Sequence, residues 1–103
     1  MKKIRLLLEY GAYPVWIYDE DNCVIDTALP EEWEHDIKLD NALTEIQNIY
    51  DSLFINNEKE FSFAGFKSEK ERENFDRKVE SAVAMLYEKN NGLYEITNNI
   101  KIL

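Results

Sequence analysis

The chain has 103 residues, of which 45% are hydrophobic, and it carries a formal net charge of −9. This length and composition fit one compact core, so we predict a single domain over residues 1–103. The negative charge argues against nucleic acids and anionic membrane surfaces as partners, because both would repel the chain. Any macromolecular partner is therefore expected to be basic.

The sequence also limits where the protein can reside. No stretch provides the roughly 18 uncharged apolar residues that a membrane helix needs. The start, MKKIRLLLEYG, has the two lysines of a signal peptide, but Arg5 and Glu9 interrupt its short apolar segment. Cys23 is the only cysteine, which excludes an internal disulfide and suits a reducing compartment. We therefore expect a cytosolic protein.

The first third of the chain has the pattern of strands. Residues 3–10, KIRLLLEY, alternate apolar and other side chains and predict a strand, although the spacing of their leucines would also suit a helix. Val15 to Tyr18 and Cys23 to Asp26 are β-branched or aromatic, and the DEDN between them has turn chemistry, so they predict a hairpin. Because both hairpin faces are apolar, we expect burial on both sides or an aromatic face offered to a partner.

Two amphipathic helices are predicted in the rest of the chain. Apolar residues at three-and-four spacing indicate the first, over about residues 40–55, with Asp40 as its N-cap. Ser68 and Glu71 form a capping box that opens the second, over about residues 69–90.

Further strands are predicted near residues 58–66 and 93–97. In the former, Phe61 and Phe63 alternate with polar neighbours, as in a half-buried strand. The fold class is therefore α+β, with a mostly antiparallel sheet packed by the two helices.

Catalytic and metal-binding patterns are weak. Cys23 and His35 are the one nucleophile and base pair available, and a lone cysteine in a strand is more often a buried hydrophobe. Asp19 and Asp21 match the first and third positions of a calcium loop, but Val24 stands where that loop requires glycine. We expect no metal, no cofactor and no enzymatic activity.

The strongest feature is acidic. Residues 19–40 contain nine acidic side chains against Lys38 alone, which leaves −8 of the net −9 in this segment. A charged run of this kind is often only a solvated face that keeps a small protein soluble. Tyr18 and Trp33 lie in or beside the run, however, and tyrosine and tryptophan are the residues that most often anchor interfaces, with surrounding charge steering the encounter. Both interpretations remain open from the sequence.

In size, acidity and the segment YPVWIYDEDNCVIDTALPEEW, the chain resembles the small immunity proteins with which bacteria neutralise polymorphic or contact-dependent toxins. Those families differ in fold and binding surface, so the resemblance transfers no site residue by position. It implies a non-enzymatic inhibitor of a toxin. The acidic run by itself favours a basic partner surface, above all the nucleic-acid cleft of a nuclease.

We therefore predict a partner-binding surface in which carboxylates steer a basic protein and two aromatic residues anchor it. An alternative is a small-ligand or metal-responsive regulatory domain in which the apolar hairpin walls a pocket. A third possibility is an enzyme that uses Cys23 and His35. The predicted partner-binding residues are Tyr18, Asp19, Glu20, Asp21, Glu31, Trp33, Glu34 and Asp36.

Overall fold

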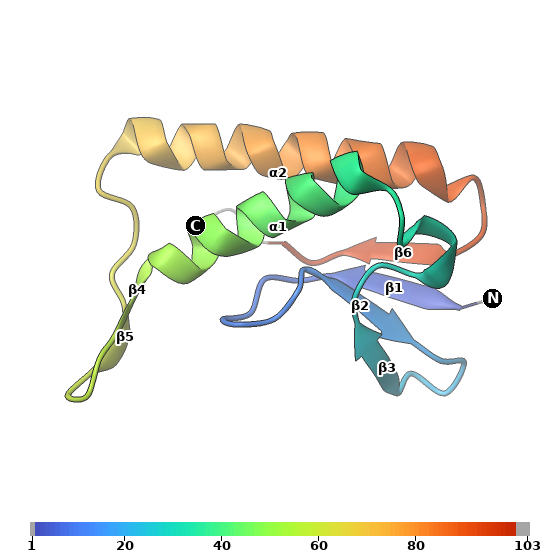
Figure 1. Ribbon diagram of the computed structural model, residues 1–103, viewed down its shortest axis with the longest axis horizontal. Coiled ribbons are helices and arrows are strands. Elements are labelled where there is room, and N and C mark those ends of the chain that lie inside the picture. Colours follow the sequence, from blue (N-terminus) through green and yellow to red (C-terminus); the bar gives the residue numbers. More distant parts are fainter. Residues whose placement is uncertain (1, 101–103) are drawn as a thin grey trace.

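A computed structural model describes residues 2–100. Two long helices lie together over one face of a small sheet, and a separate hairpin projects from one end (Figure 1). The elements, in chain order, are β1 (Lys3–Leu6), β2 (Val15–Tyr18), β3 (Val24–Thr27), the 3-10 turn η1 (Glu31–Trp33), α1 (Ile37–Ser52), β4 (Phe54–Asn56), β5 (Phe61–Phe63), α2 (Glu69–Asn90) and β6 (Glu95–Asn98). This arrangement confirms the predicted α+β class.

The main sheet has the order β3-β2-β1-β6. β2 runs antiparallel to β1 and to β3, whereas β6 runs parallel to β1. Ile4, Leu6 and Val15 are buried in the core with the inner faces of both helices. Because side chains alternate across a strand, Lys3, Arg5 and their neighbours lie on the opposite face, which no helix within residues 2–100 covers.

The predicted strands of the first third are confirmed, with two differences. The first strand ends at Leu6, earlier than the alternating pattern of residues 3–10 suggests. The hairpin forms between β2 and β3, but β3 is the outermost strand of the sheet. Its Val24 and Ile25 are 49% and 56% exposed, so the expected burial of both hairpin faces is wrong for this strand.

The first helix begins earlier than predicted because a different aspartate caps it. The Asp36 carboxylate accepts the amide N–H of Leu39 at 3.0 Å, which satisfies an unpaired donor at the helix start. Asp40, the predicted cap, lies inside the helix, where its carboxylate accepts the Tyr13 hydroxyl at 2.8 Å.

The segment after α1 differs most from the prediction. The helix ends at Ser52, and Phe54 begins β4, which pairs with β5 as a separate two-stranded sheet. The strand expected over residues 58–66 is thus only three residues long and does not join the main sheet. Its Phe61 and Phe63, expected to be half-buried, are exposed.

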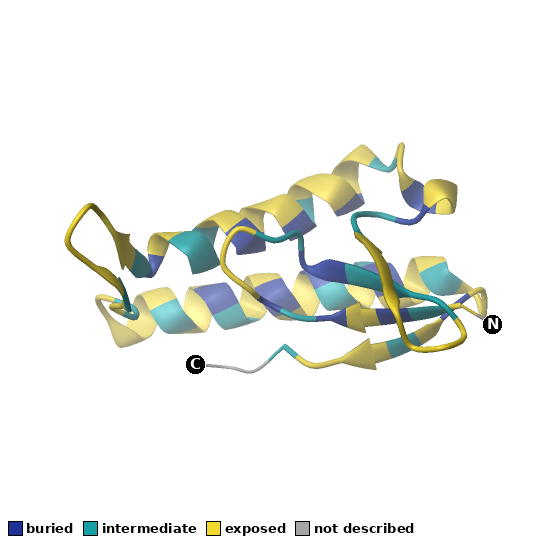
Figure 2. Ribbon diagram, turned by 90° about the horizontal axis from the view of Figure 1, so that it is seen from below, coloured by how far each residue is buried: buried dark blue, intermediate teal, exposed yellow. Residues whose placement is uncertain are grey.

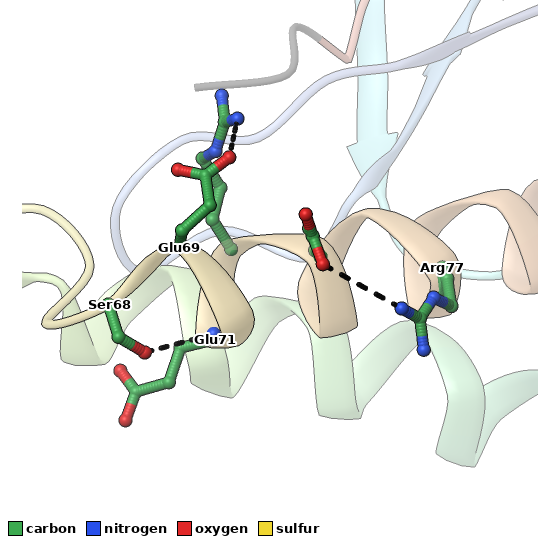
Figure 3. A network of polar contacts seen from close by, with 6 residues as sticks. Ser68, Glu69, Glu71 and Arg77 are labelled. Carbon is green, nitrogen blue, oxygen red and sulfur yellow. Dashed lines mark hydrogen bonds and ion pairs between the residues drawn. The ribbon is translucent and has the colours of Figure 1, made fainter.

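The second helix follows the sequence prediction closely. The Ser68 hydroxyl oxygen accepts the Glu71 amide N–H at 3.2 Å (Figure 3), as the capping box requires. Glu71 returns the contact to the amide of Lys67, one residue before the expected one, at 3.3 Å. An exposed ion pair joins Glu69 to Arg72 on the first turns.

No helix within residues 2–100 is both long enough and apolar enough to cross a membrane. The last three residues, 101–103, for which the sequence predicts no clear element, lie outside the described residues.

Candidate functional site

The acidic run folds at one end of the molecule. It occupies the β2–β3 turn, β3, η1 and the start of α1, whereas the β4–β5 hairpin lies at the other end of the longest axis (Figure 1). The principal extents of the chain are 42 × 28 × 22 Å. The acidic run is thus gathered in one region of the fold, and its members have several different local roles.

Trp33 is not a surface anchor, which corrects the prediction. Only 3% of the residue is exposed, and its ring meets the ring of Tyr94 edge-on with centroids 5.3 Å apart. η1 causes this burial, because one tight turn after Pro30 directs Trp33 inward while Glu31 and Glu32 remain exposed. The indole belongs to the core and packs η1 against Tyr94, the residue before β6.

Tyr18, the other predicted anchor, is half-buried in β2. It pairs with Lys3 across the ladder, so it lies on the sheet face that the helices leave uncovered. The Arg5 guanidinium lies 5.0 Å from the centre of the Tyr18 ring, a cation–π contact that already occupies one side of the ring.

Two of the predicted carboxylates hold the fold locally. One oxygen of Asp19 accepts the amides of Asp21 and Cys23, both at 2.9 Å, and so closes the β2–β3 turn. Asp36 caps α1 and forms an ion pair with Lys89 of α2. The hydrogen bond from Lys89, followed by the bond from the helix amide, holds the pKa of Asp36 below its usual value.

The other four predicted carboxylates, Glu20, Asp21, Glu31 and Glu34, are exposed. Glu34 has a neighbour of possible opposite charge, since His35 Nε2 lies 3.3 Å from its Oε1. We call these four carboxylates the acidic end.

The tertiary structure brings cations to the acidic run that the sequence segment does not contain. Besides Lys89, the charge of Lys2 acts on Glu32, whose pKa is lowered mainly by a hydrogen bond from Tyr94. Lys3 donates to the side-chain oxygen of Asn22 at 2.9 Å. The local field is therefore less negative than the −8 of the segment suggests.

The other predicted chemistries find little support in the geometry. Cys23 precedes β3 and is exposed in the β2–β3 turn, so the expectation of a buried cysteine within the strand is wrong. Its sulfur lies 4.0 Å from the Asp21 carbonyl oxygen, and the His35 side chain is 94% exposed. Within residues 2–100, no three His, Cys, Asp or Glu side chains come together to hold a metal ion.

Comparison with known protein families shows which family the chain is related to. A family model described as Serratia CdiI immunity protein-like matches residues 2–98, nearly the whole chain. The chain belongs to this family. No curated protein matches it. Family membership supports a toxin-neutralising inhibitor, and it confirms the resemblance that size, acidity and the segment over residues 13–33 suggested.

This member of the CdiI immunity protein-like family has a second surface that the sequence analysis did not identify. At the β4–β5 hairpin the rings of Tyr10, Phe54, Phe61 and Phe63 pack together, and Figure 2 shows most of the hairpin exposed. We call these four rings the aromatic end. The sequence signal was the pair of alternating phenylalanines in FSF, which we assigned to a half-buried strand.

Proposed function

We propose that the chain is an immunity protein that neutralises its cognate toxin by binding it directly, with the acidic end contacting a basic surface of the toxin. In this proposal Glu20, Asp21, Glu31 and Glu34 steer the encounter and pair with lysine or arginine of the partner. Tyr18 contributes from the adjacent sheet face, and Trp33 contributes only through the fold. The observation that carries the proposal is the family match over residues 2–98.

The charge of the chain supports a basic partner. A molecule with net charge −9 attracts cationic surfaces and repels anionic ones. At physiological salt this interaction extends over a Debye length of about 8 Å. The nucleic-acid cleft of a nuclease carries such cations, and exposed carboxylates can occupy it in place of phosphates. We therefore propose a toxin nuclease domain as the partner, met in the cytosol, and inhibition by occlusion without catalysis.

The first experiment tests the immunity function itself. Where the gene immediately upstream of this chain encodes a large secreted protein, its C-terminal domain is expressed in a sensitive bacterium, alone and with this chain. We expect growth arrest by the toxin domain alone and restored growth with the chain. Arrest that persists in the presence of abundant folded chain would contradict the immunity function for this pair.

The second experiment tests the acidic end. Association with the same toxin domain is followed by surface plasmon resonance at about 50 and about 200 mM NaCl, and we expect the rate to fall as salt rises. Charge reversal by Asp21→Lys with Glu34→Lys should slow association by about tenfold or more. Glu80→Lys with Glu88→Lys, which makes the same charge change at two exposed positions on α2, is the matched control.

The two experiments separate function from surface. If the chain restores growth while the association rate changes with neither salt nor the double reversal, the immunity function is supported. The acidic end is then not the surface that contacts the toxin. Whether the toxin domain is a nuclease is tested separately by incubating it with DNA and RNA. If both nucleic acids stay intact, the toxin is not a nuclease.

A further inference from the structure

The aromatic end is one continuous group of rings. Tyr10 contacts Phe54 and Phe61 with ring centroids 5.2 and 5.0 Å apart, and Phe54 contacts Phe61 and Phe63 at 5.5 and 5.2 Å. Tyr50 of α1 joins the group through Phe54 at 5.2 Å. Three separate segments of the chain thus meet in this group.

These rings leave much of their surface in water. Phe61 is 57% exposed, Phe63 48% and Tyr10 40%. Phe61 and Phe63 are not among the buried residues of the main core. A contiguous exposed apolar patch of this kind is typical of a binding surface, whereas scattered single apolar residues are ordinary.

The hairpin is held by contacts that do not require the outer rings. The Leu53 carbonyl oxygen accepts the amides of Ala64 and Gly65 at 2.7 and 3.1 Å, which ties the two ends of the hairpin together. At the tip, the Asn57 side chain accepts the amides of Lys59 and Glu60 at 2.9 and 3.0 Å. Backbone and turn chemistry therefore shape the hairpin, and Phe61 and Phe63 are available for another role.

The surroundings of the rings are acidic. Along the chain, residues 9–11 and 50–63 contain four acidic side chains and one cation, Lys59. The acid Glu69 and the cation Arg72 of α2 line a hollow with Phe63, and Glu60 accepts the Ser62 hydroxyl on the hairpin face opposite the rings. Asp51 accepts the amide of Gly11, the residue after Tyr10, at 3.0 Å. Burial, and then the charges of Glu9 and Asp51, raise the pKa of Tyr50. The four acidic residues are Glu9, Asp51, Glu58 and Glu60.

This charge distinguishes between two possible occupants of the patch. A second copy of the chain would bring another net −9 and another acidic rim, so association between copies would be opposed by repulsion. An apolar segment flanked by lysine or arginine matches both the rings and the rim, because cations are also attracted to the faces of aromatic rings.

We infer that the aromatic end is a docking surface that holds an apolar segment, flanked by basic residues, of the toxin domain. This inference rests on the proposed function and adds a second contact to it. The β2–β3 and β4–β5 hairpins both project away from α2, at opposite ends of the molecule (Figure 1). A partner that lies along this side of the molecule reaches both the acidic end and the aromatic end.

The test compares single alanine variants for binding to the upstream-encoded toxin domain. Phe61→Ala and Phe63→Ala are each expected to raise Kd by about tenfold or more, mainly through faster dissociation, because buried aromatic anchors dominate interface energetics. Tyr87→Ala on α2 is the matched control, since Tyr87 is 47% exposed. Phe61→Leu, which keeps an apolar side chain, should recover part of the affinity.

Folding and self-association are measured on the same variants. Thermal unfolding separates loss of the hairpin from loss of a contact, since a variant that keeps the wild-type midpoint yet binds weakly supports docking. Light scattering on the wild-type chain alone is expected to give a monomer, and a dimer that Phe61→Ala dissociates would reassign the patch to a second copy.

The possible failures are distinguishable. If the wild-type chain neither binds nor protects, the proposed function fails and this inference fails with it. If the wild-type chain binds and protects while Phe61→Ala and Phe63→Ala bind as tightly as Tyr87→Ala, only the docking surface is overturned.

Discussion

The two ends of the molecule hold their large aromatic residues in opposite ways. At the acidic end Trp33 is buried against Tyr94, with its neighbouring carboxylates outside. At the other end Phe61 and Phe63 stay about half exposed, although phenylalanine is the more apolar side chain. An aromatic residue that has charged neighbours in the sequence is therefore not always a surface anchor. The local backbone turn directs its side chain either into the core or toward solvent.

The carboxylates of the acidic run are of two kinds. Asp36 is engaged by a helix amide and by Lys89, and Asp19 by two turn amides. Such carboxylates stabilise the fold, whereas Glu31 and Glu34 lie exposed and can meet a partner. Within the acidic run, therefore, some carboxylates stabilise the fold and others are exposed to a partner.

The largest expected effect is at Trp33. Trp33→Ala should lower the free energy of unfolding by about 3–5 kcal/mol, because it opens a cavity between η1 and Tyr94. Urea unfolding measures the loss, with the half-buried Trp16→Ala as the matched control of smaller effect. If Trp33→Ala kept its stability and lost toxin binding, the indole would be an anchor after all and the contrast between the ends would disappear.

The next effect compares the two helix caps. Ser68→Ala should lower the free energy of unfolding by about 1 kcal/mol, because one amide at the start of α2 loses its acceptor. Asp36→Ala removes the cap of α1 and the ion pair with Lys89, so its thermal midpoint should fall further at low salt. At high salt the two midpoints should converge, since salt screens the exposed pair. A salt-independent difference would show that the ion pair contributes nothing.

A smaller effect is expected at the aromatic end. Phe61→Ala should lower the free energy of unfolding by about 1 kcal/mol or less, because its ring contacts are partial and outside the core. Phe75→Ala, which truncates a ring that is 1% exposed, should cost about 3–5 kcal/mol in the same assay. Equal losses would make Phe61 a structural residue and weaken its assignment to docking.

The smallest effect at neutral pH is expected at Tyr94. Burial, and then the hydrogen bond to Glu32 at 2.5 Å, raises the pKa of Tyr94 from 10.0 to about 12. Because the pKa of Tyr94 is higher in the folded state, its protonated hydroxyl stabilises the fold fully below pH 10.0. That stabilisation is lost as the pH rises toward about 12. Urea midpoints across this interval should fall less steeply for Tyr94→Phe than for the wild type. The same slope in both proteins would contradict the shift.

Local sequence signals predicted the elements that depend on local chemistry. The β2–β3 hairpin and α2 form where their turn residues and capping box indicated, because an Asx turn and an N-cap are complete within a few residues. The same signals misplaced the start of α1, since Asp36 and Asp40 are both chemically able to cap a helix. In the structure Asp36 caps the helix, and Asp40 instead accepts the hydroxyl of Tyr13 from a distant segment.

For the site, the sequence identified the acidic run but not which of its members are available for binding. Lys89 lies 53 residues from Asp36 along the chain, and its ion pair could not be inferred from the run itself. The aromatic end was missed for a similar reason. Tyr10 and Phe61 come from separate segments, and the prediction placed one in a strand and the other in a half-buried strand of the same sheet.

By itself the sequence determined the α+β class, the charge of the chain and, through its match over residues 2–98, the immunity family. Only the tertiary structure decided that Trp33 is buried and that Phe61 and Phe63 are exposed. The physical reason is that composition and short-range hydrogen bonding act within a few residues. Exposure depends on which distant segments cover a side chain, and that is settled when the sheet and helices pack.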